Sequence, residues 1–305
     1  MGQVALVVGE ALIDVVHRGD GSVAEHPGGS AANVAVALAR LDRATLFHTC
    51  FAADRYGRML SVHLDAAGVR LAGDPGSVLR SSSAVATLGD DGAATYEFDI
   101  DWRPGPLVLP DDEEPVVVHT SSYAAALPPG ADEVYAAVDS VRSRATVSYD
   151  INARPAVTGL DAEVRRRVER LVGISDVVKA SDEDLEALYP ERSVDDTAAF
   201  LLGLGPAVVV VTRGSEGASW VAATGPGTVP AIAVTVADTI GAGDTFGAAL
   251  VDALWSRGLL GAEQRPALRR LTDTDWAELL GLAARAAAVT VSRPGADPPH
   301  RHELP

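Results

Sequence analysis

Short apolar runs alternate with segments of helical periodicity along most of the chain. Segments with apolar residues three and four positions apart, which are typical of helices, cover residues 31–41, 56–67, 131–144, 161–171 and 195–204. Runs of β-branched and other apolar residues, typical of buried strands, cover 4–8, 45–51, 116–120, 146–150, 176–180 and 207–212. Because such alternation favours right-handed crossovers, we predict an α/β three-layer fold with a mostly parallel central sheet flanked by helices.

Two stretches interrupt this rhythm, residues 19–26 and 82–102. In the second, the segments 84–87 and 95–98 flank Gly89-Asp90-Asp91-Gly92, a pattern typical of a β-hairpin. Inserted strands of this kind do not easily join a parallel sheet. We therefore predict one main domain, residues 1–305, with a small β-sheet lid from roughly 15–27 and 82–103. A plain surface hairpin is the alternative.

The two ends of the chain give further expectations. Residues 1–16 are apolar but contain Glu10 and Asp14 and lack a basic leading region, so they predict a strand and not a signal peptide. The polar, Pro-rich segment 294–305 is expected to fray beyond the fold.

Composition narrows the class of protein. Hydrophobic residues make up 47% and aromatic residues 5%, so the core must consist mainly of Ala, Val and Leu. A formal charge of −17 disfavours a nucleic-acid partner, whose phosphates are bound by clustered Lys and Arg. No apolar run has the length of a membrane span. Cys50 is the only cysteine, which excludes an internal disulfide and makes the cytoplasm the default compartment.

Any nucleotide site in this chain must differ from a Walker-type phosphate loop. Lys179 is the only lysine, and no G-x-x-x-x-G-K-[ST] run exists. An acidic protein can still bind ATP, because backbone N–H groups at helix N-termini and a bound cation supply local positive potential.

The segment 238–247, Asp-Thr-Ile-Gly-Ala-Gly-Asp-Thr-Phe-Gly, holds the clearest candidate chemistry. It follows a strand-like run and opens a helix of small residues that extends to Ser256. A helix that begins at this glycine turn would aim the N–H groups of Ala242, Gly243 and Asp244 at one point, as an anion hole for a phosphoryl group. The Asp244 carboxylate could then accept a proton from an attacking hydroxyl.

Two other interpretations of this segment stay open. In the first, Asp244 only caps the helix and the glycines only turn the chain. In the second, the segment is a dinucleotide-binding fingerprint of an NAD-dependent dehydrogenase. However, one residue too many precedes Gly247, and no acidic residue ends a following strand at the required distance.

Residues 238–246 closely resemble the C-terminal signature of the ribokinase-like carbohydrate kinases. Pro27-Gly28-Gly29-Ser30-Ala31-Ala32-Asn33-Val34-Ala35 resembles the family's glycine-rich N-terminal signature. Further similarity, in the family's order, covers residues 9–14, 54–57, 148–155, 212–217 and 292–296. The resemblance implies a ribokinase-like fold and an ATP-dependent sugar kinase.

The resemblance also implies roles for individual residues. Asp244 would be the catalytic base, and Gly241, Ala242 and Gly243 would form the anion hole. The residues implied to contact the sugar are Asp14, Gly28, Gly29, Asn33 and Arg154. Those implied to contact ATP are Thr212, Gly214, Gly217 and Lys179.

Two cation sites are implied in the same way. The family's Asn-x-x-Glu element is replaced here by Ser181-Asp182-Glu183-Asp184. Asp184 would bind Mg²⁺ through water, or Ser181 would simply cap a helix. Asp238, with carbonyls near residues 292–295, resembles the family's monovalent-cation site, which would take K⁺.

Within the family, residues 9–14, 119–121, 181–184 and 292–296 look most like bacterial fructokinases, which implies D-fructose as substrate. The alternatives are 2-keto-3-deoxygluconate kinase, ribokinase and nucleoside kinases, or a sugar- or nucleotide-binding regulator without turnover. The resemblance also makes a homodimer through the lid plausible.

Overall fold

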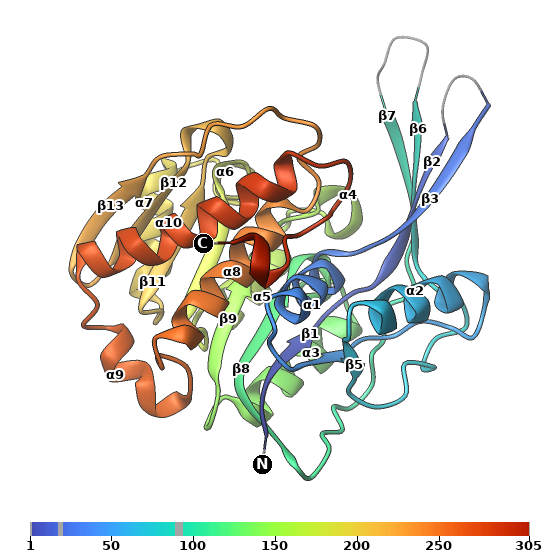
Figure 1. Cartoon of the computed structure of the whole chain (residues 1–305), viewed down its shortest axis with the longest axis horizontal. Coiled ribbons are helices and arrows are strands. Elements are labelled where there is room, and N and C mark those ends of the chain that lie inside the picture. Colours follow the sequence, from blue (N-terminus) through green and yellow to red (C-terminus); the bar gives the residue numbers. More distant parts are fainter. Residues whose placement is uncertain (1, 18–20, 89–93, 305) are drawn as a thin grey trace.

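The computed structural model describes residues 2–17, 21–88 and 94–304. It contains a nine-stranded sheet between two layers of helices and a separate four-stranded sheet (Figure 1). Strand order in the large sheet is β13-β12-β11-β10-β9-β8-β1-β4-β5. Its strands are β1 (Gly2–Val8), β4 (Thr45–His48), β5 (Arg70–Leu71), β8 (Glu113–Ser121), β9 (Thr146–Asp150), β10 (Val177–Ser181), β11 (Val208–Thr212), β12 (Ala218–Ala222) and β13 (Gly225–Val229).

All neighbours in the large sheet pair in parallel, except that β12 is antiparallel to both β11 and β13. The predicted three-layer fold with a mostly parallel sheet is therefore confirmed. The helices are α1 (Ser30–Arg40), α2 (Arg55–Ala66), α3 (Gly130–Val141), α4 (Pro155–Thr158), α5 (Ala162–Val172), α6 (Asp182–Leu188), α7 (Val194–Gly203), α8 (Ala242–Ser256), α9 (Arg265–Leu268) and α10 (Asp273–Val291).

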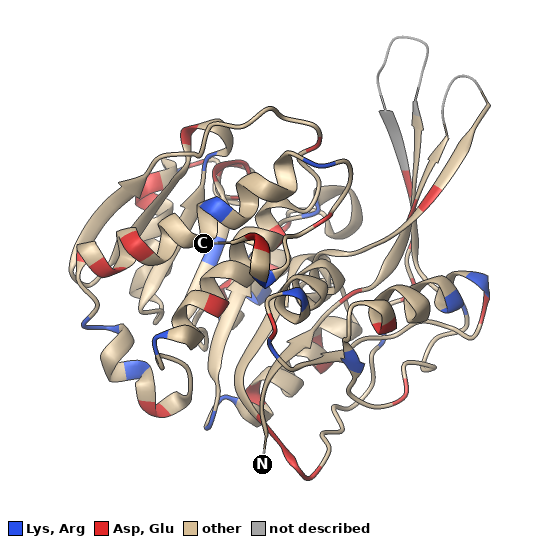
Figure 2. Ribbon diagram, viewed as in Figure 1, with Lys and Arg blue, Asp and Glu red and all other residues tan. Residues whose placement is uncertain are grey.

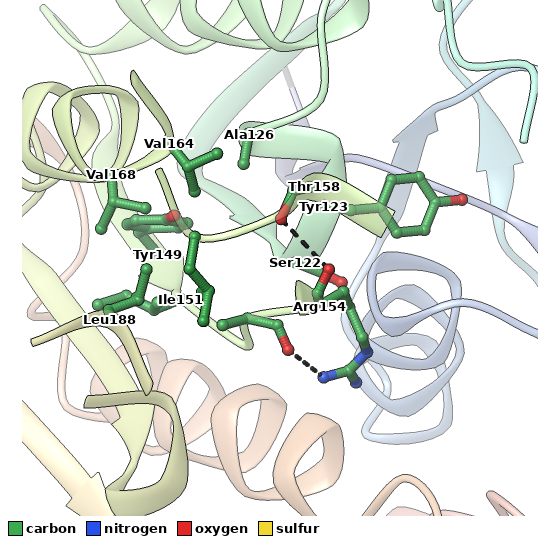
Figure 3. Close-up of a pocket in the computed structure, with 12 residues that line it drawn as sticks. Ser122, Tyr123, Ala126, Tyr149, Ile151, Arg154, Thr158, Val164, Val168 and Leu188 are labelled. Atoms are coloured by element: carbon green, nitrogen blue, oxygen red, sulfur yellow. Dashed lines mark hydrogen bonds between the residues drawn. The ribbon is translucent and has the colours of Figure 1, made fainter. Parts of the chain in front are cut away.

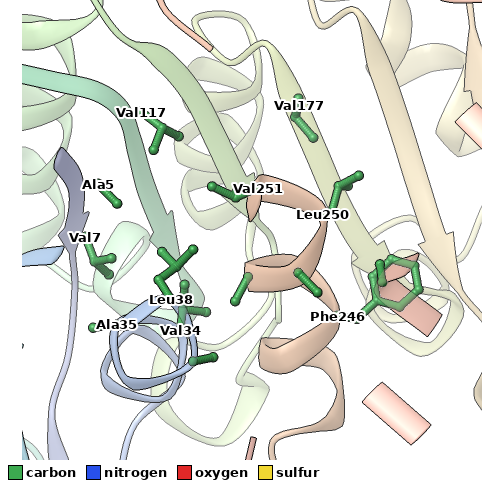
Figure 4. Packing of buried hydrophobic residues seen from close by; sticks show 14 of the residues in the cluster. Ala5, Val7, Val34, Ala35, Leu38, Val117, Val177, Phe246, Leu250 and Val251 are labelled. Carbon is green, nitrogen blue, oxygen red and sulfur yellow. The ribbon is translucent and has the colours of Figure 1, made fainter. Parts of the chain in front are cut away.

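The central strands bury side chains on both faces. On β1, Ala5 and Val7 belong to the cluster that α1, α8 and α10 complete, whereas Val4, Leu6 and Val8 belong to the cluster that includes α3, α5 and α7. Figure 4 shows Val34 and Leu38 of α1 and Val251 of α8 facing the sheet. This two-sided burial explains why the strand sequences are continuously apolar.

The smaller sheet has the order β3-β2-β6-β7 and extends away from the main body (Figure 1). Its strands are β2 (Leu12–His17), β3 (Val23–Gly28), β6 (Ser83–Leu88) and β7 (Ala94–Asp99). The predicted turn at Gly89-Asp90-Asp91-Gly92 lies outside the described residues, as do residues 18–20. The role of this sheet as a lid stays a prediction.

Three expectations about elements were wrong. The segment predicted as one strand forms two strands in different sheets, Gly2–Val8 and Leu12–His17, and Gly9 between them packs closely on α1, since a Cβ atom there would lie 2.4 Å from Cβ of Ala31. The strand-like run expected directly before Asp238 is not a strand, and its residues Val234 and Val236 are exposed. The C-terminal segment does not fray, since Arg301 donates to Asp252 at 2.8 Å and Pro298 and Pro299 are buried.

The hairpin of β12 and β13 and the helix α10 were not anticipated. Among the described residues, no helix combines the length and the apolarity needed to cross a lipid bilayer. Acidic and basic segments are interspersed along the ribbon in the view of Figure 2.

Candidate active site

The turn before α8 places backbone donors beside Asp244. Gly241 is the N-cap with φ 74°, a left-handed conformation that favours glycine. The N–H of Ala242 donates to Thr239 O over 3.3 Å, a long hydrogen bond. The N–H groups of Gly243 and Asp244 lie in the first helical turn, where no preceding helical carbonyl can pair with them. The geometry thus suits an anion hole built mainly by Gly243 and Asp244.

Two side chains of α1 hold the Asp244 carboxylate. Oγ of Ser30 donates to Oδ1 at 2.7 Å, and Nδ2 of Asn33 donates to Oδ2 at 2.8 Å. Asp244 is 8% exposed, so these bonds form away from bulk water. They fix the carboxylate between α1 and α8, while its remaining lone pairs can still accept a proton.

The glycines before α1 allow this helix to approach the side chain of Asp14 and the backbone of Glu10. A Cβ atom on Gly28 would lie 2.1 Å from Oδ2 of Asp14 on β2. Gly29 has φ 101°, and a Cβ atom there would lie 2.7 Å from Glu10 O. Asp14, Gly28, Gly29 and Asn33 therefore gather at one end of α1, on the α1 side of Asp244.

A cavity of about 680 Å³ lies on the other side of the turn. Ala242 and Gly243 line it, and so does Phe246, one turn further along α8. The four residues implied to contact ATP line it too, namely Thr212, Gly214, Gly217 and Lys179. The structure thus brings the implied nucleotide residues together with the anion-hole turn.

The segment between β13 and α8 forms an apolar wall of this cavity. Ile232, Val234 and Val236 line it and are 42%, 39% and 63% exposed. Such partly exposed apolar side chains beside polar backbone groups are typical of a small-molecule pocket. This is why residues 231–236 are apolar without being a strand.

The two residues implied to bind cations both accept hydrogen bonds from backbone N–H groups. Oδ1 of Asp184 accepts from Ala153 N at 2.8 Å and Oδ2 accepts from Ser181 N at 2.7 Å, so Ser181 and Asp184 form a capping box. Asp184 also lines the cavity. Oδ1 of Asp238 accepts from Ile240 N at 3.0 Å and Oδ2 from Gly295 N at 2.9 Å. Each carboxylate retains lone pairs for a further ligand.

Arg154 is exposed at the start of α4 and donates to Ala153 O at 2.9 Å. Behind it lies a pocket lined by Tyr149, Ile151 and Leu188 (Figure 3). Its volume is about 10 Å³, roughly the space of one water molecule, so it is too small for a sugar.

Three polar residues of the site were not assigned a role from the sequence. Ser30 N donates to Oε1 of Glu10 at 3.0 Å, and Nδ2 of Asn152 donates to Oγ of Ser30 at 2.9 Å. Asn152 also lines the large cavity. Glu10, Ser30 and Asn152 lie inside the recognised motifs, but motif matching does not show that they form one network with Asp244.

Comparisons with known proteins show the family of the chain. The sequence profile described as "pfkB family carbohydrate kinase" matches residues 3–302. The chain belongs to this family of carbohydrate kinases. A fructokinase from Rhizobium leguminosarum bv. trifolii is 34% identical over 269 residues, covering 85% of this chain and 82% of that protein. A probable fructokinase-4 from Arabidopsis thaliana is 32% identical, covering 97% and 94%.

A solved structure adds support for the fold of this kinase. It is a fructokinase double mutant from Vibrio cholerae with fructose, ADP and potassium ion bound. Its TM-score to this chain is 0.76 at 27% identity, and the match covers 96% of this chain and 94% of that one. The prediction of a ribokinase-like carbohydrate kinase is confirmed.

Burial perturbs two acidic groups of the kinase beside α1. Burial, with a smaller contribution from the nearby charge of Asp244, raises the pKa of Glu10 to about 8 despite its hydrogen bond from Ser30 N. Burial also raises the pKa of Asp14 to about 6, although His26 and Arg154 oppose the shift. Both groups therefore bind protons more tightly in the folded protein than in the unfolded chain.

The Glu10→Gln variant should depend less on pH for its stability than the wild type. Since the pKa of Glu10 rises from 4.5 to about 8 on folding, the folded state binds more protons between these values, and the wild type loses stability as pH rises through them. The glutamine does not ionise, so the variant should gain relative stability by up to about 1.4 kcal/mol per pH unit. Urea unfolding of both proteins at several pH values would measure this difference. A constant difference across the window would contradict the shift.

Proposed function

We propose that this kinase transfers the γ-phosphoryl group of ATP to D-fructose, giving fructose 6-phosphate. The observation that carries the proposal is the position of Asp244, which contacts the sugar-side residues of α1 while its neighbours Ala242 and Gly243 line the large cavity. The fructokinases among its relatives, from bacteria and a plant, support fructose as the acceptor.

In the proposed reaction, Asp244 accepts the proton of the primary hydroxyl of the sugar. The hydroxyl oxygen forms a bond to the γ-phosphorus, and the bond from this phosphorus to the oxygen bridging it to the β-phosphate breaks, releasing ADP. The N–H groups of Gly243 and Asp244 stabilise the negative charge on the transferring group. Ser30 and Asn33 keep the carboxylate oriented.

Contacts to the two substrates follow from the two sides of the turn. Asp14, Gly28, Gly29 and Asn33 would bind sugar hydroxyls, with Arg154 as a further contact. Thr212, Gly214 and Gly217, which follow β11, would bind the nucleotide, and its adenine would lie against the apolar wall of Ile232, Val234 and Val236. Lys179 would approach the phosphates.

The donor sets suit the implied cations. Asp184 would hold Mg²⁺ through water, and the ion would neutralise charge on the phosphates of ATP. Asp238, with carbonyls near residues 292–295, would hold K⁺. A lid formed by β2, β3, β6 and β7, and pairing of two such lids in a homodimer, remain part of the proposal. The mass of the protein in solution tests the dimer.

The substrate is tested by an ADP-release assay with Mg·ATP and five acceptors: fructose, ribose, 2-keto-3-deoxygluconate, glucose and adenosine. The proposal expects the highest kcat/KM for fructose. A clear preference for ribose or adenosine would exclude fructose as the substrate. Binding of sugar and ATP without ADP release would indicate the non-catalytic regulator.

The Asp14→Asn variant should bind sugar more weakly than the wild type and bind the nucleotide with unchanged affinity. The amide has one acceptor oxygen and no charge, so it cannot accept from two neighbouring hydroxyls through two oxygens as a carboxylate does, and KM for fructose should rise roughly tenfold to a hundredfold. Initial rates over a range of fructose concentrations would measure KM, and calorimetry would measure ADP affinity. Equal loss of affinity for both ligands would place Asp14 in a purely structural role.

A further inference from the structure

The only lysine of the chain forms a buried ion pair behind the anion-hole turn. Nζ of Lys179 on β10 donates to Oδ2 of Asp150 on β9 at 2.8 Å. The two side chains are 8% and 2% exposed. The pair is fixed by the sheet itself, because Lys179 and Asp150 are register partners of adjacent parallel strands. A buried charge of this kind lowers stability unless it is paired, so the position of this ion pair needs a physical explanation.

Lys179 runs beneath the first turns of α8. A Cβ atom on Gly243 would lie 3.3 Å from Nζ, and a Cβ atom on Gly247 would lie 3.9 Å from Cδ of Lys179. Lys179 also lines the large cavity. Its ammonium group therefore lies next to the same backbone that would hold the phosphoryl group.

This place is unfavourable for a cation unless an anion is near. The N-terminus of α8 carries partial positive charge, and burial disfavours the ammonium form. Burial lowers the pKa of Lys179, but the charge and the hydrogen bond of Asp150 outweigh it and raise the pKa. Asp184 and Asp244 add to this effect. His119 faces the pair too, and burial lowers its pKa to about 3, so it stays neutral.

Asp150 has one oxygen that its contact with Lys179 does not use. Its Oδ1 is buried without a hydrogen-bond partner among the described residues. The carboxylate does not reach the cavity lining, whereas Lys179 does. Asp150 can therefore act on a ligand only through the lysine.

We propose that Asp150 is a positioning residue that keeps Lys179 charged and directed at the Gly243 turn, where its ammonium group binds the phosphoryl group in transfer. This inference rests on the proposed kinase reaction. Lys179 binds the phosphate directly, whereas Asp150 acts only through its contact with Lys179.

The Asp150→Asn variant tests the proposal through the pH dependence of the affinity for a non-hydrolysable ATP analogue, which carries the γ-phosphate. Without the carboxylate, Lys179 loses its proton at lower pH, so the affinity for the analogue should fall roughly tenfold or more between about pH 6.5 and about pH 9. The wild type should change little over this range apart from the ionisation of the analogue itself, which is common to all variants. Because binding is measured by calorimetry, the result stands even if no sugar is phosphorylated, which would refute only the proposed reaction.

Two further proteins separate positioning from stability. In Asp150→Asn combined with Lys179→Arg, the guanidinium stays charged at every pH used, so the pH dependence should disappear. Asp176→Asn is the matched control, since the buried carboxylate of Asp176, just before β10, forms a 2.7 Å ion pair with the partly exposed Arg265. It should lower the melting temperature and leave the pH profile unchanged.

The proposal is overturned if Asp150→Asn keeps the wild-type pH profile, or if Asp176→Asn changes it equally. If Asp150→Asn does not fold, Asp150→Asn combined with Lys179→Met decides, because it leaves no buried charge unpaired. That double variant should fold and lower kcat by roughly 10²–10³, and an unchanged kcat would refute phosphate binding by Lys179.

Discussion

Asp244→Asn is expected to lower kcat by roughly 10²–10⁴, the range for loss of a general base. The variant should fold, because the asparagine oxygen still accepts from Oγ of Ser30. Its amide nitrogen would face Nδ2 of Asn33, which contacts Oδ2 at 2.8 Å, and a flip of the Asn33 amide restores this hydrogen bond. Only proton acceptance is removed, so affinities for sugar and ADP should stay close to those of the wild type. Steady-state rates and calorimetry measure both effects.

A second acidic residue of α8 provides the control. Asp252 is buried two turns further along and binds Arg43 at 2.7 Å and Arg301. Asp252→Asn should lower the melting temperature through these contacts and keep kcat near the wild-type value. If Asp244→Asn retains more than roughly a tenth of wild-type kcat, Asp244 is not the base.

Gly241→Ala is expected to damage the anion hole. The residue has φ 74°, a conformation that costs other residues about 1–2 kcal/mol. In addition, the new Cβ atom would lie 2.6 Å from Cβ of Ala296, so either the turn or the loop at 292–297 must move. A displaced donor in an anion hole lowers kcat by roughly 10²–10³. Initial rates and thermal unfolding would separate the catalytic loss from the loss of stability.

Gly258→Ala controls for the strain alone. Gly258 follows α8 with φ 67°, and among the described residues no atom beyond its chain neighbours lies within 4 Å of the position that a Cβ atom would take. Alanine there meets the same backbone cost without a collision. It should destabilise the protein by about 1–2 kcal/mol and leave kcat intact. Equal kcat in the two alanine variants would mean that the turn at Gly241 does not hold the phosphoryl group.

The sequence predicts the central strands well because their burial leaves a continuous apolar pattern. The strand at 146–150 was predicted with the bounds that β9 has. The same reasoning was wrong for the strand-like run before Asp238, since an apolar segment that lines a cavity has the same pattern as a buried strand. The hairpin of β12 and β13 was missed because Gly and Pro in β13 obscure the strand pattern.

The part of the candidate site that could be predicted consists of residues that lie next to one another in the sequence. Asp244 and the glycine turn lie within a few residues, so local geometry alone indicates a base beside backbone donors. Contacts such as Ser30 to Asp244 and Asp150 to Lys179 join residues 214 and 29 positions apart, and no spacing rule predicts them. The sequence therefore indicates which residues matter, while the fold shows which of them act together.

The most direct test of the central claim is phosphorus NMR of the kinase with Mg·ATP and D-fructose, run in parallel for the wild type and Asp244→Asn. The account predicts that fructose 6-phosphate and ADP form in equal amounts with the wild type, and that almost no product forms with the variant although it still binds ADP. Equal product from both proteins, or ADP formed without any sugar phosphate, would contradict it.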